Sequence, residues 1–360
     1  MSRYITRQDQ VVAALGDAEV QALVVSDLTN VRYLCGYVGS NGTLVVSPTR
    51  RVLLTDFRYL QSAAAQTKGV EIVEAGRDLA LKLAAVIGEI AATRVGFESA
   101  HVSHARHARM VADLPGVELV PTSGIVESVR IRKDADEIDV IARASTIADL
   151  AFQACVDGVF RGRTEREVAW ELGSIMRAAG ADGPSFDIIV ASGERGAMPH
   201  AVPADVPIPA DTLVTVDLGA ALEGYVSDCT RTFATGSPSD ELLHIYDVCL
   251  QAQLAAVQAV RPGISGAELD AVARTQITEA GYGDFFRHGL GHGVGLQVHE
   301  DPGARPESND MLQTGMTITV EPGIYVPDLG GCRIEDLCVV TDGGCDVVTS
   351  FPKGLITVDS

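Results

Sequence analysis

The chain has 360 residues, of which 46% are hydrophobic, and its formal net charge is −20 at pH 7. This length favours two domains, and the hydrophobic content is sufficient for sizeable cores. The negative charge argues against nucleic acid or an anionic membrane surface as the main partner, because both select a basic face.

The cysteines and the N-terminal sequence indicate a soluble protein of the cytoplasm. None of the seven cysteines forms a C-x-x-C pair, so we expect reduced, mostly packed thiols. The opening sequence MSRYITRQDQ has no apolar core of a signal peptide. No apolar run reaches the roughly 18 residues that a membrane span requires.

The first 125 residues alternate helical and extended patterns, which predicts a small α/β domain. Residues 43–66 are expected to form a strand, a turn, a second strand and a helix. Further helices are expected at 6–17, 78–94 and 105–113, and further strands at 22–26, 71–76, 94–100 and 117–123.

A second domain is expected over residues 126–360. It opens with an amphipathic helix over 135–156, and a second helix over 164–181 begins with a capping box formed by Thr164 and Glu167. Trp170 lies on this second helix and is expected in the core. Strands dominate after residue 186, with helices near 239–260 and 266–280.

The segment TLVTVDLGAALEGYVSDCTRTF predicts a β-hairpin that carries two acids. If the hairpin is symmetric about the bond between Leu222 and Glu223, Asp217 and Asp228 lie directly opposite each other on one face. Two buried carboxylates at that distance repel, so one must be protonated or a cation must lie between them.

A second hairpin, MTITVEPGIYVPDLGGCRIEDLCVV, repeats this pattern. Symmetry about Asp328 places Glu321 opposite Glu335, with Pro, Asp and Gly in the turn. Acids in strands usually face solvent. Four acids in two matched, apolar hairpins instead indicate a shared functional site.

The segment HGLGHGVGLQVHEDPG holds three of the eight histidines of the chain, His288, His292 and His299. His292 stands between two glycines, which let the backbone approach a crowded site. Four carboxylates and one imidazole favour Mn, with Co, Fe or Zn as alternatives, and two ions would neutralise the acids. His288 and His299 would then serve as proton donors or carbonyl polarisers.

Together these motifs resemble the pita-bread metallopeptidases, the family of methionine aminopeptidase, aminopeptidase P and prolidase. The matching segments are DLG…GYVSDCTRT, HGLGHGVGLQVHE, EPGIY and RIED, and SGERGAMPHAVP adds His200. The segments NVRYLCGYVGSNGTLVV and LLTDFRYLQSA are similar to the creatinase/prolidase N-terminal domain. The resemblance implies an α+β fold, with a creatinase/prolidase-like domain over 1–125 and a pita-bread catalytic domain over 126–360.

The resemblance also implies a mechanism, in which a hydroxide held between two metal ions attacks the scissile carbonyl of an Xaa-Pro bond. Glu321 would act as the proton shuttle. His200, His288 and His299 would bind substrate and stabilise the tetrahedral intermediate. Arg333 would bind the substrate carboxylate or a peptide carbonyl, and would orient neighbouring acids. The metal ligands implied by the family motifs are Asp217, Asp228, His292, Glu321 and Glu335.

Several alternatives remain open at this stage. The chain length favours an Xaa-Pro dipeptidase slightly over an Xaa-Pro aminopeptidase that acts on longer peptides. A creatinase-like amidinohydrolase and a non-catalytic binding protein share the fold, but the first lacks the metal ligands and the second typically loses some. Arg195 and Ala201 replace residues common in the family, which affects the expected substrate contacts. The resemblance further implies small proline-containing peptides as substrates and a homodimer.

Overall fold

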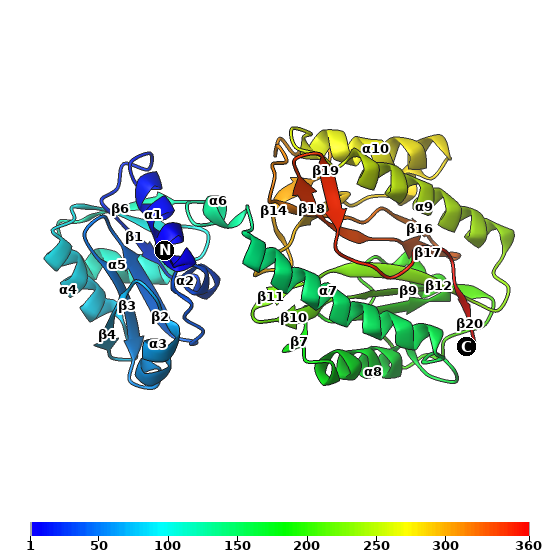
Figure 1. Cartoon of the computed structure of the whole chain (residues 1–360), viewed down its shortest axis with the longest axis horizontal. Helices are drawn as coiled ribbons and strands as arrows, with labels where there is room; N and C mark the ends of the chain where they lie inside the picture. The colour runs from blue at the N-terminus through cyan, green and yellow to red at the C-terminus, as the bar shows by residue number, and fades with distance from the viewer. Residues whose placement is uncertain (1, 360) are drawn as a thin grey trace. The chain divides into compact units, whose positions relative to one another are not determined.

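The computed structural model describes residues 2–359, which divide into two compact units (Figure 1). The first unit ends at Arg130 and the second begins at Ile131. The first unit closes with a short helix, α6 (Glu127–Arg130), that the sequence pattern does not predict.

The first unit is a six-stranded mixed sheet with helices packed against it. Its strands are β1 (Ala22–Val25), β2 (Gly42–Val46), β3 (Arg51–Asp56), β4 (Glu71–Ala75), β5 (Arg94–Glu98) and β6 (Glu118–Thr122). Its longer helices are α1 (Arg3–Ala14), α2 (Leu28–Cys35), α3 (Leu60–Gln66), α4 (Ala80–Ile90) and α5 (His104–Asp113). The predicted elements of this domain are therefore confirmed, and α2 is the one longer helix that was missed.

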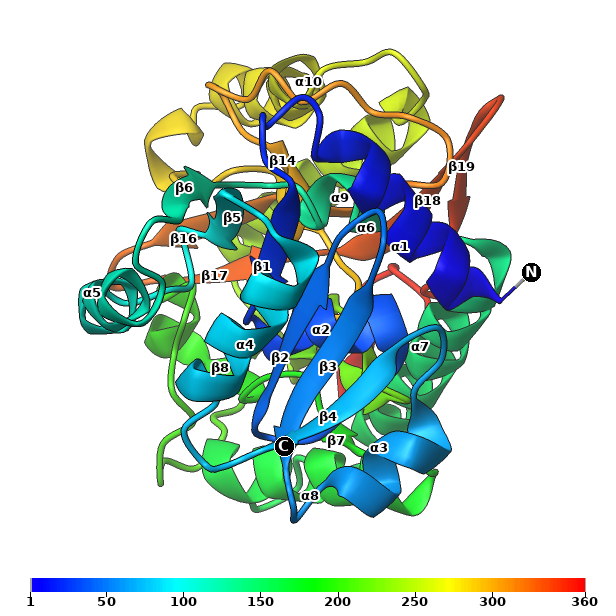
Figure 2. The same ribbon diagram turned by 90° about the vertical axis from the view of Figure 1, so that its left-hand side faces the viewer.

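The strand order of this sheet is β4-β3-β2-β1-β5-β6, and β2 runs antiparallel to both neighbours (Figure 2). Leu83, Val86 and Ile87 of α4 and Met110 of α5 share one hydrophobic cluster with β1, β3 and β5. The missed helix α2 starts where the Asp27 side chain accepts a hydrogen bond from the Thr29 amide, which is an ordinary N-cap.

The second unit contains four long helices and several short sheets. The helices are α7 (Ala135–Val156), α8 (Glu165–Ala178), α9 (Asp240–Ala259) and α10 (Gly266–Glu279). The strands are β7 (Gly183–Pro184), β8 (Ile189–Ser192), β9 (Thr212–Leu218), β10 (Ala220–Leu222), β11 (Tyr225–Val226), β12 (Cys229–Thr235), β13 (Gly291–Gly293), β14 (Glu300–Ala304), β15 (Thr317–Val320), β16 (Gly323–Val326), β17 (Gly330–Arg333), β18 (Asp336–Thr341), β19 (Gly344–Val347) and β20 (Thr357–Val358).

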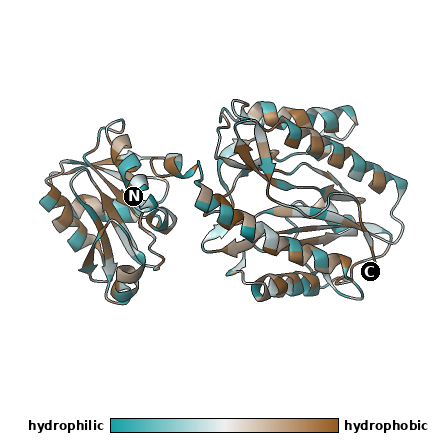
Figure 3. Cartoon of the chain, viewed as in Figure 1, coloured by the Kyte–Doolittle hydropathy of each residue, from teal (hydrophilic) through white to brown (hydrophobic). Residues whose placement is uncertain are grey.

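These elements form two halves, each a pair of helices packed on strands (Figure 1). Helices α7 and α8 share a core with β8, β9 and β12, and α9 and α10 share another with β15, β16, β17 and β18. The helices carry both hydrophilic and hydrophobic residues, as their amphipathic patterns predict (Figure 3). The strands of the two halves lie between the helix pairs.

Helix α8 shows both a successful and a wrong prediction. The Thr164 side chain accepts from the Glu167 amide, and the Glu167 carboxylate accepts from the Thr164 amide, so the predicted capping box is confirmed. Trp170, however, is 80% exposed. The buried stripe of α8 runs through Val168, Leu172 and Met176, and Trp170 falls outside its helical spacing.

Neither a disulfide nor a membrane-spanning helix is present among the described residues. All seven cysteines are free thiols there, and six of them are buried. Among residues 2–359, none of the helices combines the length and the apolar composition that crossing a membrane requires.

Candidate metal centre

The hairpin that carries Asp217 and Asp228 has a different register from the predicted one. Asp217 lies opposite Thr230, not Asp228. The hairpin turns at Glu223 and Gly224, which have φ values of 49° and 83°, a pattern of two positive φ angles that matches the right-handed twist of paired strands. The turn centre is therefore one residue later than expected, and the strand pairing shifts by two residues.

This shift of two residues preserves the face on which both acids lie, because side chains alternate with a period of two. Val214, Val216 and Leu218 of β9 pack into the core beneath α7 and α8. Asp217 therefore faces the opposite side of the sheet, and Asp228 is its diagonal neighbour across the hairpin.

The second acidic hairpin has the predicted register. Gly323 pairs with Arg333 in the β16–β17 ladder, and Val320 pairs with Asp336 in the β15–β18 ladder, so both ladders are symmetric about Asp328. Glu321 and Glu335 occupy matching positions in the gap between these two ladders, as the sequence symmetry predicts.

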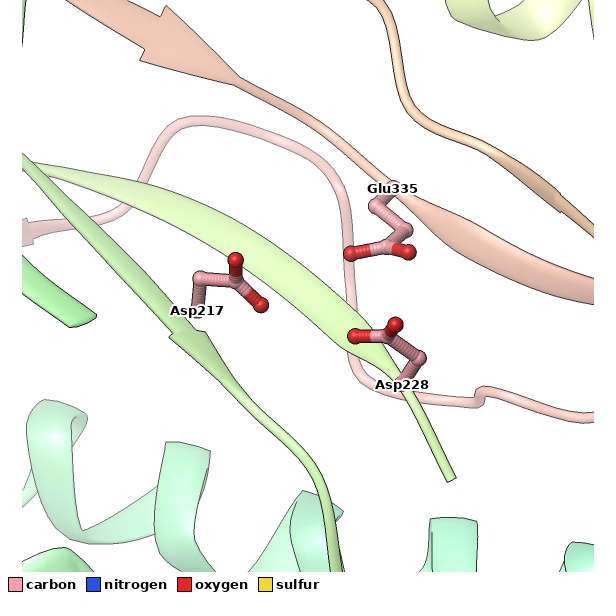
Figure 4. Close-up of side chains that lie close together, drawn as sticks. All are labelled: Asp217, Asp228 and Glu335. Carbon is pink, nitrogen blue, oxygen red and sulfur yellow. The ribbon is translucent and has the colours of Figure 1, made fainter. Parts of the chain in front are cut away.

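Three carboxylates of the second unit lie close together. Oxygen atoms of Asp217, Asp228 and Glu335 all lie within 4.8 Å of one another, and the three carboxylates point toward one shared space (Figure 4). His292 joins this group, because its Nε2 lies 3.1 Å from Glu321 Oε1 and 3.7 Å from Asp228 Oδ2. All five residues that the sequence predicts as ligands are therefore brought together.

The electrostatics of this cluster favour a bound cation. Burial raises the pKa of Asp217, Asp228 and Glu335 above the ordinary carboxyl value, and repulsion between neighbouring carboxylates adds to the effect. Asp217 Oδ1 and Glu335 Oε1 are buried without a hydrogen-bond partner. Because a buried acceptor without a partner is costly, these orphaned oxygens fit direct ligation of a metal ion.

His292 is oriented to present its Nε2 to the carboxylates. Its Nδ1 lies 3.0 Å from the Gly293 carbonyl, which can only accept, so we assign the proton to Nδ1 and leave Nε2 as the ligating atom. Burial lowers the pKa of His292, but the hydrogen bond and charge of Glu321, together with Asp228, raise it overall. The site therefore favours positive charge beside these acids, whether a proton or a metal ion.

Two threonine hydroxyls donate hydrogen bonds to acids of the cluster. Thr230 Oγ1 donates to Glu335 Oε2 over 2.8 Å, and Thr319 Oγ1 donates to Glu321 Oε1 over 3.0 Å. Neither of these two hydrogen bonds is predicted from the sequence. The position of Thr230 two residues after Asp228, on the same strand face, was the available signal.

His288 is held by the protein through both ring nitrogens. Its Nδ1 lies 2.8 Å from the Gly289 carbonyl and its Nε2 lies 3.0 Å from the Tyr325 hydroxyl. Burial lowers the pKa of His288, so the ring is neutral near pH 7, with the proton on Nδ1. The Tyr325 hydroxyl therefore donates to His288 Nε2, a contact that is not predicted from the sequence.

His299 and His200 are the more accessible histidines of the predicted set, and both side chains are exposed. The His299 ring lies 4.3 Å from the His292 ring in an edge-to-face arrangement. Burial, followed by the nearby His292, lowers the pKa of His299, which keeps the imidazole neutral. His200 follows Pro199, whose carbonyl accepts a hydrogen bond from Arg333 Nη1 over 3.2 Å.

Arg333 is buried, and its side chain donates four hydrogen bonds, including the one to the Pro199 carbonyl. Its Nη2 donates to Asp217 Oδ2 over 2.6 Å, and Nη1 donates to the Tyr325 hydroxyl over 2.8 Å. Its Nε also donates to Thr230 Oγ1 over 3.1 Å. Of the two roles expected for Arg333, these contacts favour the orientation of neighbouring acids over the binding of a substrate carboxylate.

Gly291 shows why glycines surround His292. A Cβ atom added at Gly291 would lie 1.9 Å from the Thr319 carbonyl oxygen, a backbone atom that cannot move freely. We expect Gly291→Ala to lower the free energy of unfolding by about 1–3 kcal/mol and to weaken metal binding by displacing His292. Gly343→Ala is the control, since nothing lies within 4 Å of its added Cβ. Equal stability of the two variants in urea unfolding would refute this steric explanation.

Two family models match the chain. The model described as Metallopeptidase family M24 matches residues 139–342, and the model described as Creatinase/Prolidase N-terminal domain matches residues 7–132. An uncharacterized peptidase of Bacillus subtilis, YqhT, is 43% identical over 341 residues, which cover 95% of this chain and 97% of that protein.

Solved structures match over nearly the whole chain. An Xaa-Pro dipeptidase from Bacillus anthracis has a TM-score of 0.96 and 40% identity, with 99% of this chain and 100% of that chain covered. An X-Pro aminopeptidase from Thermotoga maritima has a TM-score of 0.90 and 33% identity, with 98% and 99% covered. The predicted fold class, a pita-bread domain preceded by a creatinase/prolidase-like domain, is therefore confirmed.

Proposed function

The chain belongs to metallopeptidase family M24, and on this premise we propose that it is an Xaa-Pro dipeptidase that requires two divalent metal ions. The observation that carries the proposal is the cluster of Asp217, Asp228 and Glu335, whose oxygen atoms lie within 4.8 Å of one another and include two buried atoms without hydrogen-bond partners. Such a donor set suits hard divalent ions, and we propose Mn²⁺, with Co²⁺, Zn²⁺ or Fe²⁺ as alternatives.

We propose that the five clustered residues, Asp217, Asp228, His292, Glu321 and Glu335, would together hold the two ions. When bound, two such ions supply Lewis acidity at the scissile carbonyl and make water a better nucleophile near neutral pH.

The residues of the chain supply proton transfer and positioning. Glu321 would accept a proton from the attacking water on its carboxylate and deliver it to the proline nitrogen as the peptide bond breaks. The neutral imidazole of His299, exposed beside His292, would donate a hydrogen bond to the oxygen on which negative charge develops. His200 would contribute from its own exposed loop.

The contacts of His288 and Arg333 give these two residues less direct roles. His288 already accepts a hydrogen bond from Tyr325, and Arg333 donates to Tyr325 and Asp217. We propose that Arg333 fixes the orientation of Asp217 and that His288 shapes the substrate side of the site. A proline ring can pack against the side of the site that His288 shapes without leaving a donor unpaired, since the proline nitrogen of an Xaa-Pro bond carries no N–H.

Composition and family resemblance favour a cytoplasmic homodimer that acts on small peptides. Seven free thiols fit the reducing cytoplasm, where we place the protein. We propose a homodimer and small proline-containing peptides as substrates. Nucleic acid and membranes have no part in the proposal, because the net charge of −20 disfavours both.

Substrate length separates the two leading activities. We expect kcat/KM for Ala-Pro to exceed that for Ala-Pro-Ala by about 10-fold or more, since a dipeptidase blocks the space beyond proline. Steady-state assays of both peptides at equal metal loading measure this ratio. A higher kcat/KM for the tripeptide would instead assign the chain as an Xaa-Pro aminopeptidase. Creatine hydrolysis that persists after chelation would favour the amidinohydrolase alternative.

A further inference from the structure

A buried ion pair lies outside the proposed ligand set. Lys133 Nζ lies 3.2 Å from Glu300 Oε2, and the two side chains are only 1% and 6% exposed. Breaking such a pair leaves an uncompensated charge in the protein interior, so its members stay together. The position of Lys133 is fixed in turn, because its amide donates to the Gly315 carbonyl over 2.7 Å.

Glu300 connects this pair to the turn that follows His292. Its second oxygen, Oε1, accepts a hydrogen bond from the Gln297 amide over 2.9 Å. The backbone of the turn closes tightly around the carboxylate, since a Cβ added at Gly295 would lie 2.7 Å from Glu300 Oε2. Glu300 also pairs with Gly293 across the β13–β14 ladder, next to the register shift after His292. Glu300 therefore holds the turn at two points, through its carboxylate at the Gln297 amide and through its backbone opposite Gly293.

This turn places His299 beside the candidate metal centre. His299 immediately precedes Glu300, and its ring contacts the ring of His292 at 4.3 Å between centroids. We propose that Lys133 and Glu300 are positioning residues, whose buried ion pair fixes the turn over 294–300 and thereby sets His299 against His292. The positioning of His299 by the ion pair is independent of the proposed function, whereas its effect on catalysis rests on that function.

Hydrogen exchange in the metal-free protein tests whether the ion pair fixes the turn over 294–300. Lys133→Met removes the positive charge that lies 3.2 Å from the Glu300 carboxylate, so the carboxylate is expected to shift and to loosen its hydrogen bond to the Gln297 amide. We expect faster exchange in peptides that cover 294–300 and unchanged exchange in those that cover β9 and β12. The exposed Lys82→Met is the control and should leave both unchanged. Unchanged exchange over 294–300, or an equal increase everywhere, would overturn the proposal.

A double-mutant cycle tests the consequence for catalysis. Lys133→Met is expected to lower kcat/KM for Ala-Pro by about 10- to 100-fold, as is usual for residues that orient a catalytic group. In a His299→Asn background the same change should have little further effect, because the group it positions is already gone. If the fold-changes in kcat/KM of the two substitutions multiply, the Lys133–Glu300 ion pair acts on the fold alone and not through His299. Failure of the wild-type protein to cleave any Xaa-Pro peptide would refute the proposed function but leave the exchange result valid.

Discussion

Asp228→Asn is expected to lower kcat/KM for Ala-Pro by about 10³-fold or more, a loss of several kcal/mol in transition-state stabilisation. Asp228 is 5% exposed and its carboxylate lies in the cluster with Asp217 and Glu335. The amide keeps the size of the side chain but removes the negative charge and one of the two ligating oxygens. Metal analysis of the purified variant should show fewer bound ions per chain than in the wild type.

Asp346→Asn is the matched control for this substitution. Asp346 lies on β19 in the same unit, but its side chain is exposed and belongs to neither hairpin of the site. The control should retain wild-type activity and metal content. An Asp228→Asn variant that keeps full activity at full metal occupancy would remove Asp228 from the catalytic centre.

Arg231→Met is expected to lower the free energy of unfolding by about 3–5 kcal/mol. Arg231 is 2% exposed, and its Nη2 donates to Asp336 Oδ1 over 2.9 Å and to the Phe351 carbonyl over 2.7 Å. Its Nη1 donates to the carbonyl of Glu335. Methionine fills a similar volume but removes the guanidinium donors from the Phe351 and Glu335 carbonyls and a buried positive charge from beside Asp336. The backbone that carries Glu335 therefore loses a hydrogen bond.

Urea unfolding of the metal-free protein, followed by circular dichroism, measures this loss. Arg143→Met is the control, because Arg143 forms exposed ion pairs with Asp139 and Glu223 that should contribute at most about 1 kcal/mol. Equal unfolding midpoints for the two variants would contradict the role assigned to Arg231. A loss of activity without a loss of stability would instead indicate a direct role at the site.

The sequence predicted the site well where the relevant contacts follow from local geometry. The symmetry of the second hairpin about Asp328 placed Glu321 and Glu335 together, because a turn fixes the register of the strands it joins. The first hairpin was placed two residues out of register. Glycine at 224 was the available signal for a two-residue turn, because such turns favour glycine at their second central position.

Contacts between distant segments could not be predicted in the same way. Lys133 and Glu300 are 167 positions apart, and nothing in either local sequence identifies the other as a partner. Arg333 illustrates a related limit, since the sequence suggested contact with substrate or acids but not that its guanidinium is shared among Asp217, Tyr325 and Thr230. Such pairings depend on how the two halves of the unit pack.

Titration of the metal-free protein with Mn²⁺, while Ala-Pro hydrolysis is followed, tests the proposed two-ion centre most directly. We expect activity to rise to its maximum near two ions per chain, about the number that four carboxylates and one imidazole can hold, and to disappear again on chelation. Undiminished hydrolysis of Ala-Pro by protein from which all metal has been removed would contradict the two-ion centre.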